Sequence, residues 1–481
     1  MNKEFEFVIG LEVHLQVKTE SKMFCRCAAD YFGQKPNSRV CPVCLGLPGA
    51  LPVPNALAVK KCLSLCLATN CQINKISKFD RKNYFYPDLP KGYQISQYDL
   101  PLGENGFLEF DVDSDSRRVR IRRIHLEEDT GKSMHTNEET LLDFNKSGIP
   151  LIEIVTEPDF VDIEEVLAFA KRLRQTVRYL GISNADMEKG QMRYELNMSL
   201  RKVGSQKLPQ YKVEVKNIGS ISVLEKVIKY EFERQADILA SGKLPTQETR
   251  GLRDLSGKTY SQRIKEDADD YRYFPEPDIP PMHFSDEYLE EIKSTICELP
   301  QARKHRYVFD YKLEPDTAEV LITSKVRSDW FEEAIEKIKD TALIKEIAKW
   351  LIKDVNAIIK EQKLKLSELK FTPKQFSQLV EMLYQKKLSG TLAKQVLAEM
   401  NSTGDEPEAI VNRKGLSIMA DETELIKVIK TVFKDNANVV GDTKKNPNAA
   451  KFLLGQVMKA TKGKADPAES ARLIADLLSK E

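Results

Sequence analysis

The chain of 481 residues lacks several features that would at once place it in a common class of protein. No apolar run approaches the roughly 20 residues that a membrane-spanning helix needs. The N-terminus shows no basic segment followed by an apolar one, so we recognise no secretory signal. We therefore expect a cytoplasmic protein without a membrane partner, in which the cysteines stay reduced.

The chain also lacks an excess of charge and the common nucleotide-binding motifs. It has 74 lysines and arginines against 73 aspartates and glutamates, so local patches rather than bulk charge would have to bind a polyanionic partner. It contains neither a GxxxxGKS or GxxxxGKT loop nor a GxGxxG motif after a predicted strand, which argues against P-loop and Rossmann sites. The absence of a Gly-x-Ser-x-Gly elbow argues against an α/β-hydrolase.

The length predicts two to four domains, and the hydrophobic pattern changes once along the chain. Residues 1 to about 290 consist mainly of short alternating segments rich in glycine and proline, with helices expected at 160–180 and 223–241. From about residue 287 the pattern predicts a series of helices, at 288–296, 315–323, 329–337, 341–359, 372–386 and 389–400. These patterns predict an α+β protein in which helical domains follow a sheet domain.

The first predicted strand carries a carboxylate and an imidazole side by side. Residues 5–17 alternate strictly, with the aromatic and aliphatic side chains on one face, as in a half-buried strand. Glu12 and His14 lie on the other face together with Gly10, which leaves room for something to approach. Such a polar face is either exposed to water or takes part in chemistry.

Seven of the eight cysteines precede residue 72. Cys25, Cys27, Cys41 and Cys44 form two close pairs, a spacing that predicts four thiolates on one tetrahedral zinc ion, although the first pair is CxC rather than CxxC. Four protein ligands leave no open coordination position, so such a zinc ion would be structural. The alternative interpretation is four unrelated free thiols.

Two further segments place carboxylates where a cation would be needed. Residues 127–129 are three consecutive acids, which repel one another unless a cation or bases lie nearby. An exposed acidic turn, neutralised by the preceding arginines, explains this segment equally well. Glu153 lies between two isoleucines in a predicted strand. A carboxylate in such surroundings needs a partner, and a divalent cation is a natural one.

The cleanest alternation in the chain runs from 192 to 201. Its polar face, continued by Lys212, Glu214 and Lys216 on the next alternating segment, consists of Arg193, Glu195, Asn197, Ser199 and Arg201. This face is either exposed to water or the floor of a cleft that holds a phosphorylated nucleotide on Mg²⁺, and periodicity does not decide between the two. The charged and aromatic loop 78–88, which includes Lys82, we interpret as functional. Together these residues favour an enzyme with oxygen-ligated Mg²⁺.

Several long motifs resemble, in the right order, the B subunit of the aspartyl/glutamyl-tRNA(Asn/Gln) amidotransferases. They are IGLEVH at 9–14, SKFDRKNYFYPD at 77–88, GYQISQ at 92–97, LEEDTGK at 126–132, DFNKSGIPLIEIVTEPD at 143–159 and DYRYFPEPD at 270–278. The resemblance runs nearly end to end, since residues 452–464, FLLGQVMKATKGK, are similar to the family's tail domain.

The resemblance implies an ATP-dependent ligase that acts on mischarged tRNA. The B subunit would phosphorylate the side-chain carboxylate of Glu-tRNA(Gln), Asp-tRNA(Asn) or both, and ammonia from the A subunit, an amidase, would replace the phosphate. The small C subunit would complete a heterotrimer, and the cognate aminoacyl-tRNA synthetase would be a further partner. The implied domains are a catalytic cradle similar to glutamine synthetase at 1–292, with a zinc loop at 25–44, a helical domain at 293–405 and a tRNA-binding tail at 406–481.

The resemblance also implies roles for individual residues. It gives His14, Glu128 and Glu153 as Mg²⁺ ligands, Glu12 as a further acid of the pocket, and Lys82 as a lysine at the mouth of the ammonia channel. The residues by themselves do not choose Glu128 over Glu127. ATP binding is expected on the polar strand faces, at Arg193, Glu195, Asn197, Ser199 and Lys216. The four cysteines match those members that carry a structural Zn²⁺.

The C-terminal region offers separate support for an RNA partner. Residues 426–464 contain nine lysines against two acids, and lysines suit sequence-independent contacts to phosphates; a solvated helix surface is the alternative. Two rival functions remain, an ATP-dependent ligase for a small carboxylate without RNA, and a zinc-stabilised RNA-binding chaperone without catalysis. The basic tail argues against the first, and the pairing of Glu12 with His14 argues against the second.

Overall fold

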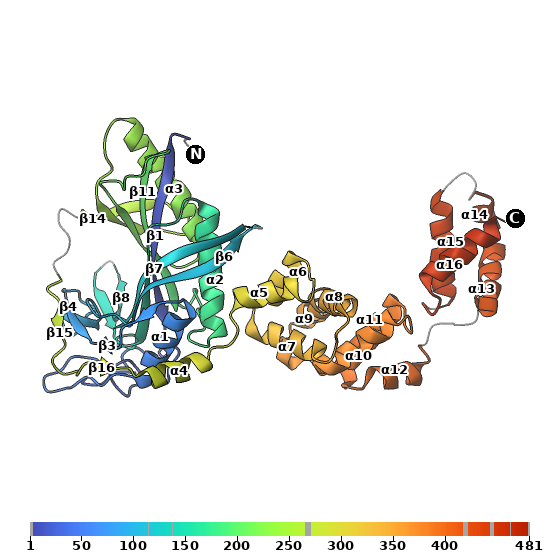
Figure 1. Ribbon diagram of the computed structural model, residues 1–481, viewed down its shortest axis with the longest axis horizontal. Helices are drawn as coiled ribbons and strands as arrows, with labels where there is room; N and C mark the ends of the chain where they lie inside the picture. The colour runs from blue at the N-terminus through green and yellow to red at the C-terminus, as the bar shows by residue number, and fades with distance from the viewer. Residues whose placement is uncertain are drawn as a thin grey trace. The chain divides into compact units, whose positions relative to one another are not determined.

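The computed structural model describes residues 3–113, 115–136, 138–264, 271–416, 422–442, 447–461 and 463–479. The chain falls into two compact units, Met1–Ala302 and Arg303–Glu481, which Figure 1 colours from blue to yellow and from yellow to red. The described strands all belong to the first unit, whereas the described elements of the second unit are helical.

A nine-stranded mixed sheet forms the centre of the first unit. Its strands are β1 (Phe5–Gln16), β2 (Gln72–Ile73), β6 (Gly103–Val112), β7 (Asp115–Glu128), β10 (Pro150–Thr156), β11 (Met192–Lys202), β12 (Val213–Ile218), β13 (Glu248–Leu252) and β14 (Thr259–Ile264). They lie in the order β14-β13-β12-β11-β1-β10-β7-β6-β2. Only the β12–β13 pair among these neighbours is parallel.

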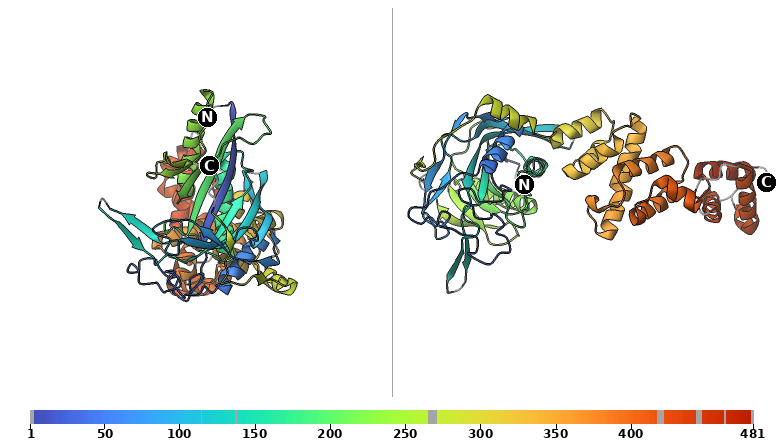
Figure 2. Two further views of the ribbon diagram at one scale, coloured as in Figure 1. Left: turned by 90° about the vertical axis from the view of Figure 1, so that its left-hand side faces the viewer. Right: turned by 90° about the horizontal axis from the view of Figure 1, so that it is seen from below.

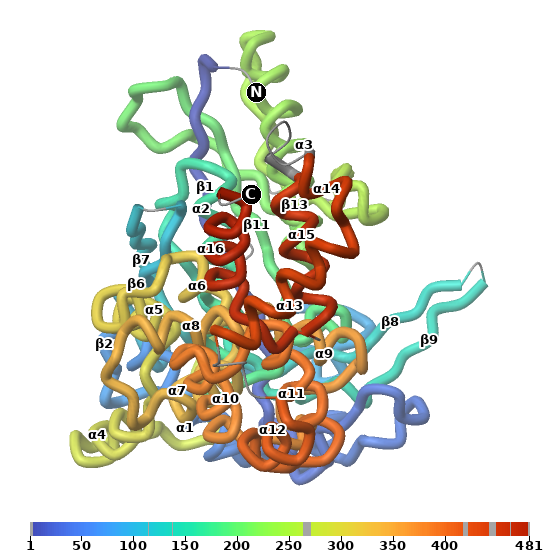
Figure 3. The backbone as a smooth tube through the Cα atoms, turned by 90° about the vertical axis from the view of Figure 1, so that its right-hand side faces the viewer, coloured from blue at the N-terminus to red at the C-terminus, as the bar shows by residue number. Residues whose placement is uncertain are grey.

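Three smaller sheets lie around this one. They are formed by β15 (Phe274–Pro275), β4 (Asp80–Asn83) and β5 (Tyr93–Ser96), by β3 (Ile76–Ser77) and β16 (Met282–His283), and by β8 (Lys132–His135) and β9 (Thr140–Asp143). Figures 2 and 3 show β8 and β9 projecting from the sheet unit as an arm. The β4–β15 pair matters for the site, because it joins two segments about 190 residues apart in the sequence.

Helices cover the apolar face of the large sheet. The first unit contains α1 (Ala56–Ala68), α2 (Ile163–Tyr179), α3 (Ile221–Ala240) and α4 (Asp286–Ser294), and α5 (Pro300–Phe309) follows. Helix α1 packs on β7, α2 on β6, and α3 on β11. Along β1 the alternate residues Ile9, Leu11 and Val13 are completely buried in this core. The polar side chains of β1, β10 and β11 alternate with core residues and therefore lie on the opposite face of the sheet.

The described residues of the second unit form two separate apolar cores. The first core lies among α6 (Pro315–Leu321), α7 (Lys325–Ile335), α8 (Thr341–Trp350), a π-helix (Leu351–Val355), α9 (Asn356–Gln362), a short 3-10 helix (Leu366–Glu368), α10 (Pro373–Tyr384), α11 (Gly390–Thr403) and α12 (Pro407–Lys414). The second core lies among α13 (Glu422–Asp435), α14 (Ala437–Asp442), α15 (Pro447–Ala460) and α16 (Pro467–Leu478).

The α+β fold with helical domains after a sheet domain is thus confirmed. One predicted helix, 341–359, is interrupted by the π-helical turn at 351–355, a feature that hydrophobic periodicity does not reveal. In the part of the chain that the structure describes, no helix is long and apolar enough to cross a membrane.

A buried ionic cluster fixes α3 to the edge of the sheet. Glu231 on α3 is completely buried and accepts hydrogen bonds from Arg234 Nη2, at 2.8 Å, and from Thr259 Oγ1. In addition, Arg250 Nε of β13 lies 3.1 Å from its Oε1 atom. A buried carboxylate with several cationic and hydrogen-bonding partners fixes its surroundings, because removing it leaves charges without compensation.

We expect Glu231→Leu to lower the free energy of unfolding by about 3 kcal/mol, because two arginines lose their shared acceptor. Chemical denaturation followed by circular dichroism measures this change. Glu225→Leu on the same helix is the matched control, since the Glu225 side chain is 40% exposed and pairs with Lys229 one turn along; it should cost about 0.5 kcal/mol or less. Equal losses in the two variants would contradict the role given to Glu231.

Candidate active site

The polar face of the large sheet brings side chains from four strands into one row. His14 of β1 pairs with Glu153 of β10 on one side and with Arg193 of β11 on the other. Glu153 in turn pairs with His125 of β7. Directly paired residues of neighbouring strands lie roughly 5 Å apart on one face, so polar side chains run without a break across the centre of the sheet.

One end of this row forms a first group of metal-type ligands, His14, Glu127 and Glu153. One ligand atom from each of the three lies within 4.8 Å of the others, and His14 Nδ1 is 2.9 Å from Glu127 Oε1. Burial by itself would lower the pKa of His14, but the hydrogen bond to Glu127 and the neighbouring carboxylates raise this pKa to about 9. The carboxylates therefore create a place that strongly favours a cation.

A second group, Glu12, Glu195 and Glu214, adjoins the first along β1, β11 and β12. Its ligand atoms also lie within 4.8 Å of one another. The Asn197 amide donates to Glu12 Oε1 at 2.9 Å, and Lys216 Nζ lies 3.3 Å from Glu195. Burial, together with the charges of the other glutamates, raises the pKa of Glu12. One lysine thus offsets only part of the negative charge.

Lys82 of β4 lies in an aromatic cage beside the first group. Its Nζ is 4.8 Å from the centre of the Tyr271 ring and 5.8 Å from that of Tyr84. Burial opposes the charge of this lysine, but Glu127 and Glu153 raise its pKa. Lys82 is therefore held in its charged form between carboxylates and ring faces.

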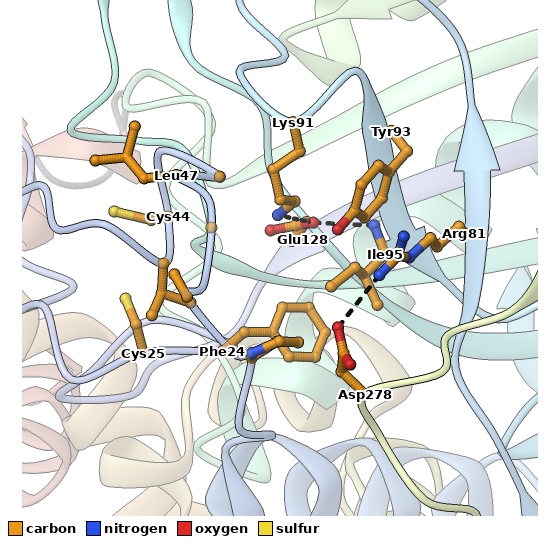
Figure 4. A pocket seen from close by; sticks show the side chains of 15 residues that line it. Phe24, Cys25, Cys44, Leu47, Arg81, Lys91, Tyr93, Ile95, Glu128 and Asp278 are labelled. Atoms are coloured by element: carbon orange, nitrogen blue, oxygen red, sulfur yellow. Dashed lines mark hydrogen bonds and ion pairs between the residues drawn. The ribbon is translucent and has the colours of Figure 1, made fainter.

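Glu128, which the family resemblance gave as a Mg²⁺ ligand, lies elsewhere. Its carboxylate accepts hydrogen bonds from Lys91 Nζ, at 2.5 Å, and from the Ile95 amide, at 2.9 Å. It lines a separate pocket of about 200 Å³ whose other lining residues include Arg81 (Figure 4). Successive residues of a strand point to opposite sides, so Glu127 and Glu128 cannot share one site. The geometry favours Glu127 over Glu128 in the first group.

The remaining polar residues predicted for the cradle lie on the same sheet face but not all in the two groups. Arg193 contacts Asp129, with 3.4 Å between Nη2 and Oδ1. Ser199 pairs with Val8 of β1, two residue pairs beyond the Gly10–Asn197 pair. His125, which the sequence did not single out, places its Nε2 3.3 Å from Glu153. His125 of β7 is thus a further contact of Glu153 on this face.

Glu214 is the other ligand-type residue that sequence reasoning left unselected. It lies on β12, where Thr249 Oγ1 donates to its Oε2 at 2.8 Å. The alternation of Lys212, Glu214 and Lys216 had placed it on a polar face. Only the pairing of β12 with β11, which sets Glu214 opposite Asn197, brings it to Glu12.

The four cysteines predicted to bind zinc lie together. Their sulfur atoms are within 4.8 Å of one another, close to the roughly 3.8 Å between sulfurs around a tetrahedral zinc ion with Zn–S bonds of about 2.3 Å. The Cys41 amide donates to Cys44 Sγ at 3.2 Å. The hydrogen bond from Cys25 lowers the pKa of Cys44 to about 4, and the nearby charge of Lys22 acts in the same direction. The donor set fits a structural zinc ion.

Lys22 beside this cluster is completely buried. Its Nζ lies 3.6 Å from Cys44 Sγ and 3.3 Å from the Phe144 carbonyl oxygen. A buried ammonium group needs such partners, and four thiolates on a divalent ion carry an excess of negative charge that it would offset.

Comparison with known proteins gives matches along nearly the whole chain. Residues 7–290 match the model of the GatB/GatE catalytic domain, and residues 329–478 match that of the GatB domain. A protein of Thermomicrobium roseum, named as the B subunit of an aspartyl/glutamyl-tRNA(Asn/Gln) amidotransferase, is 47% identical over 481 residues, which cover 99% of each chain. Proteins of the same name from Persephonella marina and Thermotoga sp. are each 44% identical, with at least 98% of either chain covered.

The position of Glu127 predicts a clear difference between two adjacent carboxylates. Glu127→Gln should weaken binding of Mn²⁺, used as a paramagnetic substitute for Mg²⁺, at least about 10-fold, because it removes a ligand from the first group. Glu128→Gln, the matched control, should leave the affinity within about 2-fold. Electron paramagnetic resonance titration of free Mn²⁺ measures both, and the opposite order would show that Glu128 is the ligand.

The cysteine cluster predicts about one zinc ion per chain, which Cys44→Ser should remove almost completely. Elemental analysis by mass spectrometry measures the content, and the melting temperature should fall with it because structural zinc stabilises the fold. Cys297→Ser is the control, since Cys297 lies outside the cluster. Full zinc content in Cys44→Ser would contradict the four-cysteine site.

Proposed function

Since the chain belongs to the family of the amidotransferase B subunits, we propose that it activates the side-chain carboxylate of Glu-tRNA(Gln), Asp-tRNA(Asn) or both. A carboxylate oxygen forms a bond to the γ-phosphorus of ATP while the bond from this phosphorus to ADP breaks. Ammonia then attacks the carbonyl carbon, phosphate leaves, and the nitrogen loses a proton to give the amide. The family is one of ATP-using, multi-subunit enzymes.

The observation that carries this proposal is that two clusters of three metal-type ligands lie next to each other on one face of the sheet. We assign one Mg²⁺ to His14, Glu127 and Glu153, and a second to Glu12, Glu195 and Glu214. Bound Mg²⁺ would neutralise charge as two anions, the triphosphate and the substrate carboxylate, approach each other. The protein's own part is to hold six ligand side chains on neighbouring rigid strands, so that no reorganisation is needed.

Cations of the chain complete this arrangement. Lys216 lies between Glu195 and Glu214, where it would face phosphate oxygens together with Arg193. Asn197 and Ser199 supply uncharged polar groups to the same floor. We propose this strip of β11 and β12 as the place where ATP binds.

The aromatic cage of Lys82 supports a role in the entry of ammonia. The rings of Tyr84 and Tyr271 lie against the ammonium group of Lys82. Burial raises the pKa of a third tyrosine, Tyr273, and the charge of Lys82 acts against that rise. Ring faces and carboxylates attract small cations, but they do not bind neutral ammonia tightly. We propose that Lys82 stands where ammonia, released by the amidase of the complex, reaches the activated carboxylate.

The helical unit would hold the tRNA. We propose the division into a cradle at 1–292, a helical domain at 293–405 and a tail at 406–481, with the A and C subunits completing the enzyme. Of the tail lysines, Lys427, Lys430 and Lys434 on α13 and Lys451 and Lys459 on α15 are exposed, whereas Lys444, Lys445 and Lys462 lie outside the described residues. Exposed lysines on two adjacent helices suit phosphate contacts.

The decisive experiment measures ADP formation by the complete enzyme with Glu-tRNA(Gln), ATP and Mg²⁺. Glu153→Gln should lower the rate at least about 100-fold, because it removes a ligand worth several kcal/mol of charge stabilisation. Glu157→Gln, a control just beyond the same strand that pairs with the exposed Arg122, should stay within about 2-fold. Charged tRNA that binds without any ADP formation by the wild type would refute the proposal.

A further inference from the structure

A bulge beside the first ligand group turns two consecutive arginines toward one side of the sheet. Val155 of β10 pairs with Arg123 of β7, whereas the next residue, Thr156, pairs with Ile121. Two residues of β7, Arg122 and Arg123, therefore occupy the space opposite a single residue of β10. Bulges are found where a strand must re-aim a side chain, often next to active sites.

The two arginines share the polar face because the residues on either side of them do not. Ile121 and Ile124 are completely buried in the apolar core. Arg122 forms two hydrogen bonds with the carboxylate of Glu157, at 2.9 and 2.8 Å, and is largely exposed. The ion pair with Glu157 thus accounts for the position and the charge of Arg122.

Arg123 has no comparable partner among the described residues. Within the described residues its Nε is buried and has no hydrogen-bond partner, and no ion pair joins its guanidinium to a carboxylate. An unpaired buried donor of a charged group costs about 1–3 kcal/mol or more. Such a cost in the middle of the sheet is offset when a bound anion supplies the missing acceptor.

The surroundings of Arg123 place it beside the proposed reaction. Burial raises the pKa of Tyr273 to about 12, and the charges of Lys82 and Arg123 act against that rise, while Glu153 adds to it. On β10 the partners of Arg123 and His125 are Val155 and Glu153, so Arg123 lies two residues along the sheet from the first ligand group, on the same face. Two further buried atoms of this face, His125 Nδ1 and Asn197 Oδ1, also lack a partner in the described structure.

We propose that Arg123 binds the oxygens of the phosphoryl group while it moves from ATP to the substrate carboxylate. This inference rests on the proposed function and adds a residue to it. A guanidinium offers two parallel donors that match two phosphoryl oxygens. The phosphoryl group keeps its negative charge in ATP, during transfer and in the acyl phosphate, whereas the substrate carboxylate loses its charge when it is phosphorylated. A fixed cation aimed at the phosphoryl group is therefore useful throughout the step.

The test compares Arg123→Gln, Arg123→Lys and the control Arg122→Gln in the complete enzyme. Arg123→Gln should lower kcat for ADP formation with Glu-tRNA(Gln) about 100-fold, and weaken binding of the β,γ-imido analogue of ATP about 10-fold. Its affinity for ADP, which lacks the γ-phosphoryl group, should stay within about 2-fold. Arg123→Lys keeps the charge and should recover part of the rate, and Arg122→Gln should resemble the wild type.

Each other outcome overturns the inference. Unchanged kcat in Arg123→Gln would remove Arg123 from the reaction. Equal losses of affinity for ADP and for the analogue would show a merely structural role, and if Arg123→Gln does not fold, the same comparison in Arg123→Lys decides. A raised KM for Glu-tRNA(Gln) with normal ATP kinetics would assign Arg123 to the substrate carboxylate instead. Wild-type enzyme without ADP formation would refute the proposed function itself.

Discussion

Repulsion among carboxylates on one face of a sheet is the constraint on which the rest of this structure depends. Glutamates from β1, β7, β10, β11 and β12 gather within two adjacent groups, and like charges so close together cannot all stay ionised without compensation. His14, Lys82 and Lys216 lie among these carboxylates and offset part of the negative charge, yet the pKa of Glu12 remains raised. Divalent cations bound with a triphosphate would supply the missing positive charge, which links the shape of the site to its chemistry.

The apolar face of the sheet and the helices packed on it hold this unfavourable arrangement in place. On the core face of β1, Ile9, Leu11, Val13 and Leu15 are completely buried, and the hydrogen-bonded register fixes which side chains meet on the opposite face. Thr249 holds Glu214, and the buried cluster around Glu231 holds the strand that carries Thr249. Stability provided by the apolar side thus offsets the cost of the polar side, as is expected at functional sites.

Alternation along single strands predicted the polar face with Glu12, His14 and Glu153, because a period of two is a local property of the sequence. Alternation did not select Glu127. The arginines before it hide which residues of β7 face the core, and the bulge at 122–123 interrupts the alternation between the two faces. The apolar Ile124 and Leu126 were the available signal. Pairing between strands that are distant in sequence brought in Glu214, and the cage of Lys82 needed Tyr271, about 190 residues away.

In the proposed reaction the chain joins the substrate carboxylate covalently to phosphate. Glu-tRNA(Gln) labelled with ¹⁸O at both oxygens of the side-chain carboxylate tests this step most directly, in the complete enzyme with ATP and an ammonia source. Because the carboxylate oxygen that attacks phosphorus leaves with the phosphate, the account predicts one ¹⁸O atom in each inorganic phosphate released, measured by mass spectrometry. Amide product formed together with phosphate free of ¹⁸O would contradict the account.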